Sequence, residues 1–212
     1  MPTKTIIINN TLLFDFNKLY LKDLDNEYFI NAKYPELQIK VEKEENIKLN
    51  SIVKESKILL NENYHLAVNL SNYLVQLIMY LIENNKVIPY YELDDFEIIN
   101  NNILFTNTDK IIDFKDLSNY NFEINKTSKI IFLSNNEISQ LKNIEKTRNS
   151  IINLTIKSLS YVLLYILNKN IILKNGINIL QAYKSLDIIS GTKLYYFLEK
   201  TKQGTNKKLI YI

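Results

Sequence analysis

The acidic residues with the most suggestive spacing are Asp94, Asp95, Glu97, Asp113 and Asp116, which surround a block of short apolar segments. Paired carboxylates at such spacing can hold Mg²⁺ or act as general acid and base. Acidic residues are also common in turns and at solvated strand ends. The sequence leaves both interpretations of this set open.

The single histidine, His65, stands next to Tyr64 at the start of an apolar segment. A serine–histidine–aspartate triad would have to use it, and no G-x-S-x-G motif accompanies it. A metal site there would lack a second imidazole, and a chain without cysteine cannot form a thiolate site. We expect His65 to be structural or incidental, and we expect no catalytic residue and no metal site.

Glycine is scarce: the only glycines are Gly176, Gly191 and Gly204. A loop that wraps phosphates needs backbone that approaches closely and adopts positive φ, and glycine supplies both. Because no glycine precedes Gly176, neither a P-loop, a dinucleotide fingerprint nor a kinase glycine-rich loop can be written on this chain. The sequence therefore predicts no nucleotide cofactor.

Composition indicates one ordinary globular domain. The chain has 212 residues, 46% of them hydrophobic, and a net charge of +3 with acidic and basic residues interspersed. Arg148 is the only arginine, which argues against a nucleic-acid partner. No signal peptide and no uninterrupted apolar run of about 18 residues is visible, and the absence of cysteine favours the cytoplasm.

The N-terminal part of the chain is predicted to be mainly strands. Apolar and aromatic residues favour strands over Thr5–Phe16 and Glu27–Tyr34. Leu37, Ile39 and Val41 alternate with polar residues, which predicts a half-buried strand. A short helix is expected at Ser51–Leu60.

The remainder is predicted to be mainly helical. Apolar residues at helical spacing predict buried helices over Asn63–Asn84 and Ile151–Asn168. Ser134–Glu137 has the pattern of a capping box, and Asn178–Lys200 is expected to be helical with a break near Gly191. Four short strands are expected between the long helices: Ile98–Ile99, Ile103–Phe105, Lys110–Phe114 and Lys129–Leu133. This order is not a βαβ repeat, so it predicts an α+β fold.

The segments Asn101–Phe105 and Ile111–Phe114 resemble the catalytic-loop and metal-binding segments of protein kinases. The resemblance implies a degenerate, two-lobed, protein-kinase-like fold in a single domain over residues 1–212. Its small β-rich N-lobe would span about 1–61, its mainly helical C-lobe about 62–200, and its tail 201–212. Lys40, Asn102 and Asp113 match catalytic positions, whereas no His-Arg-Asp precedes Asn102 and the glycine expected after Phe114 is a lysine.

Over roughly residues 5–200 the chain is also similar to the cytoplasmic domain of the EssB/YukC proteins of type VII secretion. The similarity lies in Tyr28–Ala32, the helix around Tyr64–Leu81, Asn102–Phe105 and Gly191–Tyr195. It implies a membrane-associated pseudokinase that scaffolds a WXG100 secretion complex from the cytoplasmic face. The partners implied are a membrane ATPase and WXG100-type substrates, with a homodimer also allowed and the membrane reached through a segment outside this chain.

Two other interpretations remain open. The first is an atypical or viral kinase that uses Lys40, Asn102 and Asp113 for phosphoryl transfer. The second is a plain protein-interaction domain without kinase ancestry.

Overall fold

The computed structural model describes residues 3–20, 29–31, 37–42, 46–48, 60–99, 102–120, 132–143, 147–173, 176–177 and 179–202. The chain divides into two compact units. Unit 1 contains Met1–Lys57 and Leu93–Lys110, and unit 2 contains Ile58–Glu92 and Ile111–Ile212. The chain therefore returns to unit 1 after the first long helix of unit 2.

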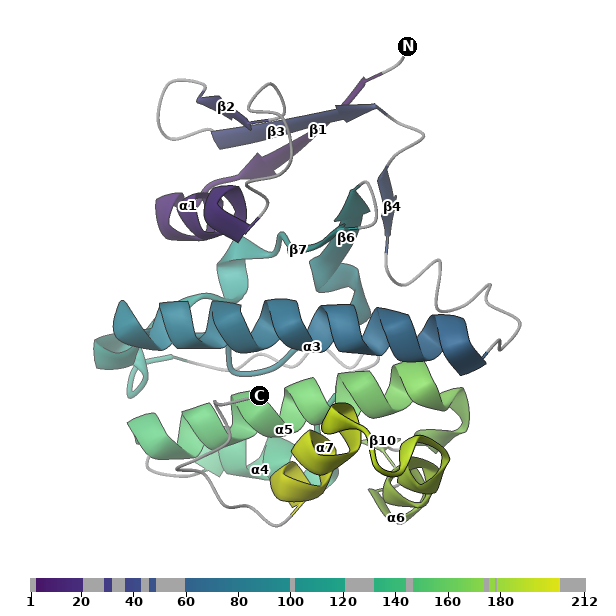
Figure 1. Cartoon of the computed structure of the whole chain (residues 1–212). Coiled ribbons are helices and arrows are strands. Elements are labelled where there is room, and N and C mark those ends of the chain that lie inside the picture. Colours follow the sequence, from purple (N-terminus) through teal and green to yellow (C-terminus); the bar gives the residue numbers. More distant parts are fainter. Residues whose placement is uncertain are drawn as a thin grey trace. The chain divides into compact units, whose positions relative to one another are not determined.

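Unit 1 contains two small antiparallel sheets (Figure 1). The strands of the first, in the order β1-β3-β2, are β1 (Thr3–Ile8), β3 (Leu37–Glu42) and β2 (Phe29–Asn31). The strands of the second, in the order β4-β6-β7, are β4 (Asn46–Lys48), β6 (Phe96–Ile99) and β7 (Asn102–Phe105). The predicted strands at Leu37–Val41, Ile98–Ile99 and Ile103–Phe105 are confirmed.

The predicted strand over Thr5–Phe16 is wrong after Ile8. A helix, α1 (Thr11–Tyr20), follows β1, because the side chain of Asn10 accepts a hydrogen bond from the Leu13 N–H at 3.0 Å and caps the first turn. Leu13, Phe14 and Phe16 are buried on one face of this helix, whereas Leu19 is exposed. A single capping side chain decided between strand and helix here.

Unit 2 is built around α5 (Arg148–Leu167), which packs against α3 (Leu60–Glu83) (Figure 1). All residues of α5 from Leu154 onward except Lys157 are buried, as expected of a helix that is apolar on most faces. Asn63–Glu83 and all of α5 are long and apolar enough to cross a membrane by length and composition alone. Burial in a protein core accounts equally well for the apolar composition of α5, because 78% of its span is buried inside the structure.

Short elements surround this helix pair. β5 (Lys86–Val87) pairs with β8 (Ile112–Asp113), and the turn η5 (Phe114–Asp116) follows. The predicted strand Lys110–Phe114 is therefore only two residues long, since Lys110 ends the turn η4 (Thr108–Lys110). Val87, Ile112 and Leu117 join Leu141 and Leu154 in one apolar cluster.

The C-terminal half of unit 2 is helical. Its helices and turns are α4 (Asn135–Asn143), α6 (Ile179–Lys184), η7 (Ser185–Ile189) and α7 (Lys193–Lys202). The turn η6 (Lys169–Ile171) leads into a two-stranded ladder of β9 (Ile172–Leu173) and β10 (Gly176–Ile177). Gly191, at φ +80°, makes the expected break before α7.

Some sequence predictions fall partly on residues outside the described ranges. These are 27–28 and 32–34 of the second strand, 51–59 of the short helix, 129–131 of the last strand and 203–212 of the tail. Phe132 and Leu133 form a bend rather than a strand. Helices and antiparallel sheets together confirm the α+β class.

Candidate functional site

The three kinase-like residues occupy three separate elements. Lys40 lies on β3 opposite Thr5, and Asn102 begins β7 opposite Ile99, both in unit 1. Asp113 lies on β8 in unit 2. Within unit 1, Lys40 and Asn102 belong to different sheets.

Asp113 is held by local contacts. Its side chain accepts a hydrogen bond from the Lys115 N–H at 3.2 Å and caps η5. The ammonium groups of Lys86 and Lys115 lie 3.7 and 3.6 Å from its carboxylate. The Lys115 N–H, with the charges of both lysines, holds the pKa of Asp113 below its ordinary value. A metal ion bound by this carboxylate would compete with two lysines.

The acidic set that the sequence singled out is divided between the two units. Asp94, Asp95 and Glu97 belong to unit 1, whereas Asp113 and Asp116 belong to unit 2. Across the residues that the structure describes, no group of three or more acidic or histidine side chains could hold a metal ion.

Asp95 closes the base of the β6–β7 hairpin. It is 1% exposed, and its carboxylate accepts hydrogen bonds from Lys110 Nζ and from the Asn107 amide, each at 2.7 Å. Its carbonyl accepts a hydrogen bond from the Thr106 N–H at 2.8 Å. These contacts give Asp95 a structural role.

A second buried carboxylate, Glu137, organises the helical part of unit 2. Its Oε2 accepts a hydrogen bond from the Ser134 N–H at 2.8 Å, and Ser134 Oγ accepts one from the Glu137 N–H at 3.3 Å. These reciprocal bonds confirm the predicted capping box. Glu137 Oε1 accepts a hydrogen bond from Tyr161 at 3.1 Å and lies 3.1 Å from Lys157 Nζ. The sequence pattern identified the cap but not these two partners from α5.

We expect unit 2 to lose stability above about pH 10, the ordinary pKa of tyrosine. Burial, with the nearby charge of Glu137, raises the pKa of Tyr161 above that value. The fold thus favours the neutral phenol, and its stabilisation is complete below pH 10 and is lost as the pH rises further. In Tyr161→Phe, the free energy of unfolding should fall less steeply with pH, by up to about 1.4 kcal/mol per pH unit.

Urea unfolding followed by circular dichroism between neutral and alkaline pH measures this difference. Tyr196→Phe, which changes an exposed tyrosine on α7, is the matched control and should follow the wild-type curve. Identical pH dependence of Tyr161→Phe and wild type would contradict the prediction.

His65 and Arg148 each lie beside an aromatic ring. His65 is exposed on α3, and its ring lies 5.9 Å from that of Tyr64. The Arg148 guanidinium donates a hydrogen bond to the Ile82 carbonyl at 3.1 Å and lies 4.6 Å from the centre of the Phe114 ring. The single arginine thus connects the start of α5 to the end of α3 and to η5.

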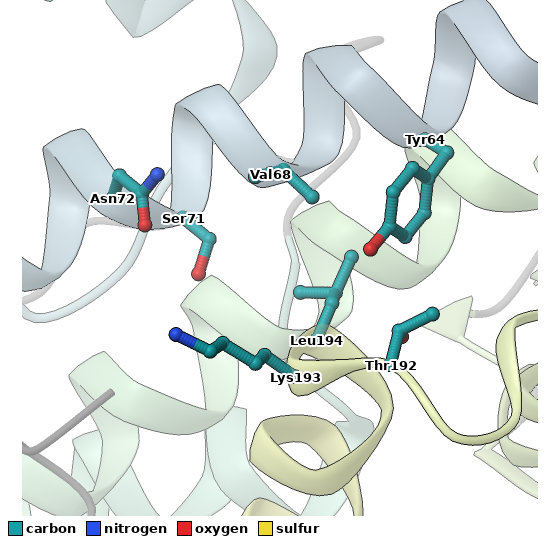
Figure 2. Close-up of a pocket in the computed structure, with 7 residues that line it drawn as sticks. All are labelled: Tyr64, Val68, Ser71, Asn72, Thr192, Lys193 and Leu194. Carbon is teal, nitrogen blue, oxygen red and sulfur yellow. The ribbon is translucent and has the colours of Figure 1, made fainter.

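A hollow of about 410 Å³ lies between α3 and the start of α7 (Figure 2), and its described lining residues all belong to unit 2. Helix α3 contributes Tyr64, Val68, Ser71 and Asn72, which follow one helical face. The start of α7 contributes Thr192, Lys193 and Leu194. This volume is in the range of small-molecule sites.

Sequence reasoning missed these residues as a site. The signals present in the sequence are the polar pair Ser71-Asn72 within an apolar helix and the Gly191-Thr192 pair before Lys193. Neither signal says that the two segments meet, because they are separated by more than a hundred residues of chain.

Comparison with protein-family models, curated proteins and solved structures found no match to this chain.

Proposed function

We propose that this chain is a catalytically inactive, kinase-like domain that acts as a scaffold at the cytoplasmic face of a type VII secretion complex. Its partners in this proposal are a membrane ATPase and WXG100-type substrates. The membrane is reached through a segment outside this chain. The secretion part of the proposal depends on the sequence similarity described above.

The observation that carries the non-catalytic part is the surroundings of Asp113. In an active kinase the corresponding aspartate must be available to hold Mg²⁺. Here the carboxylate caps η5 and lies within 4 Å of two lysine ammonium groups. The absence of any glycine before Gly176 supports the same conclusion, because a phosphate-covering loop has no glycine to use.

The division into two units is compatible with a two-lobed description except at Leu93–Lys110, which belong to unit 1 although the resemblance implies that they lie in the C-lobe. The sheets β1-β3-β2 and β4-β6-β7 belong to unit 1, and α3, α5 and α7 belong to unit 2. The kinase-like assignment of these units remains part of the proposal.

We expect ATP·Mg²⁺ to leave the thermal stability of the chain unchanged. A ligand present at 100 times its Kd stabilises a protein by about 2.7 kcal/mol, which a thermal melt detects readily. The same experiment on Asp113→Asn should give the wild-type melt, because asparagine can also cap a helical turn. Asp116→Asn, which changes an exposed acid of the same turn, is the matched control.

The kinase alternative gives the opposite outcome. Stabilisation by ATP·Mg²⁺, with phosphate transfer that Asp113→Asn abolishes and Asp116→Asn retains, would overturn the proposal.

A further inference from the structure

The hollow between α3 and α7 has one polar end formed by two helices. Figure 2 shows the Ser71 hydroxyl and the side chain of Lys193 extending into it from opposite sides, with Asn72 beside Ser71. The Tyr64 ring, Val68 and Leu194 provide the apolar part of the lining. A ligand that fits must therefore carry both an apolar body and a polar group.

Ser71 is the buried polar group at this end. The residue is 3% exposed, and no hydrogen bond of its hydroxyl group is found among the residues that the structure describes. The Ser71 hydroxyl, which points into the hollow, thus has donor and acceptor capacity available for a ligand.

Helix α7 adds positive charge at the same place. Thr192 caps it: its Oγ1 accepts a hydrogen bond from the Tyr195 N–H at 3.1 Å, and its carbonyl accepts one from the Tyr196 N–H at 3.2 Å. Lys193 and Leu194 follow this cap, and the first N–H groups of an α-helix have no acceptor within the helix. The helix dipole makes this end positive and attracts anions.

Among the described residues that line the hollow, Lys193 is the only charged one. It is exposed, and within the part of the chain that the structure describes it makes no ion pair. One ammonium group at a helix N-terminus balances one negative charge. This balance favours a carboxylate over a doubly charged phosphate.

We infer that the hollow between α3 and α7 binds a carboxylate attached to an apolar body. Lys193 and the N-terminus of α7 neutralise the carboxylate, and Ser71 hydrogen-bonds to it. Tyr64, Val68 and Leu194 contact the apolar part. Two sources share this chemistry: a free short-chain carboxylic acid and the C-terminal residue of a peptide. The inference concerns unit 2 alone and does not depend on kinase ancestry or on secretion.

The test is a titration of the 212-residue chain with N-acetyl-leucine and with its neutral amide, followed by NMR. We expect saturable binding of the carboxylate with a Kd of about 1 mM, and binding of the amide weaker by about tenfold. Lys193→Met should also weaken carboxylate binding about tenfold, and Ser71→Ala should weaken it several-fold. Lys200→Met, which removes the same charge from an exposed position of α7 outside the hollow, should bind as wild type.

Thermal melts separate ligand binding from folding. The side chains of Ser71 and Lys193 make no hydrogen bond or ion pair among the described residues, so Ser71→Ala and Lys193→Met should melt at the wild-type temperature. A peptide that ends in leucine distinguishes the two sources: binding tighter than N-acetyl-leucine by about tenfold indicates a peptide C-terminus, and equal binding indicates a free acid. Equal affinity for acid and amide, or no saturation of the acid up to about 10 mM, would overturn the inference.

Discussion

Asp95→Ala is expected to destabilise unit 1 by about 3–5 kcal/mol, the usual cost of removing one partner from a buried ion pair. The substitution leaves Lys110, whose side chain is 11% exposed, without the carboxylate 2.7 Å from its Nζ. It also removes the acceptor of the Asn107 amide. These groups join the start of β6 to the turn after β7. The amides of this hairpin should therefore be the first to lose protection from hydrogen exchange.

Hydrogen exchange of the β6 and β7 amides measures this effect directly. Asp109→Ala, at an exposed position in the same turn as Lys110, is the matched control and should change stability by less than about 0.5 kcal/mol. A double substitution of Asp95 and Lys110 by leucine should cost less than Asp95→Ala, because no charge is then left buried. Equal protection in Asp95→Ala and wild type would show that the ion pair has no structural role.

Leu163→Ala is expected to destabilise unit 2 by about 2–5 kcal/mol. Leu163 is fully buried on α5, the helix that packs against α3, α6 and α7. Truncation removes apolar contacts and leaves a cavity that a closely packed core cannot fill by relaxing. Thermal unfolding followed by circular dichroism should show a clearly lower Tm.

The control for this prediction is Leu180→Ala on α6. Leu180 is 81% exposed, so its truncation should change stability by less than about 0.5 kcal/mol. Similar melting temperatures for Leu163→Ala and wild type would mean that α5 is not the centre of the core of unit 2.

The long helices could be predicted from the sequence because their signals are local. Apolar residues at helical spacing predicted Asn63–Asn84 and Ile151–Asn168, and the helices found are α3 (Leu60–Glu83) and α5. The Ser134–Glu137 capping box was predicted for the same reason, since both of its hydrogen bonds join residues three apart.

The strand over Thr5–Phe16 failed because an apolar run of this length fits either a strand or a helix. The side chain of Asn10 caps the first turn and so starts α1. The strand predicted over Lys110–Phe114 was too long for a different reason. Its residues in β8 pair with β5, which is itself only two residues long. The residues before and after β8 belong to the turns η4 and η5.

The sequence by itself determined the α+β class, the two long apolar helices and the absence of a glycine-rich phosphate loop, because composition and residue spacing encode these directly. Only the tertiary structure decided that Asp95 forms an ion pair with Lys110 and that Asp113 forms one with Lys86. It alone placed Ser71 opposite Lys193. Such pairings depend on which distant segments pack together, and the alternation of apolar and polar residues along one segment carries no information about its neighbour in space.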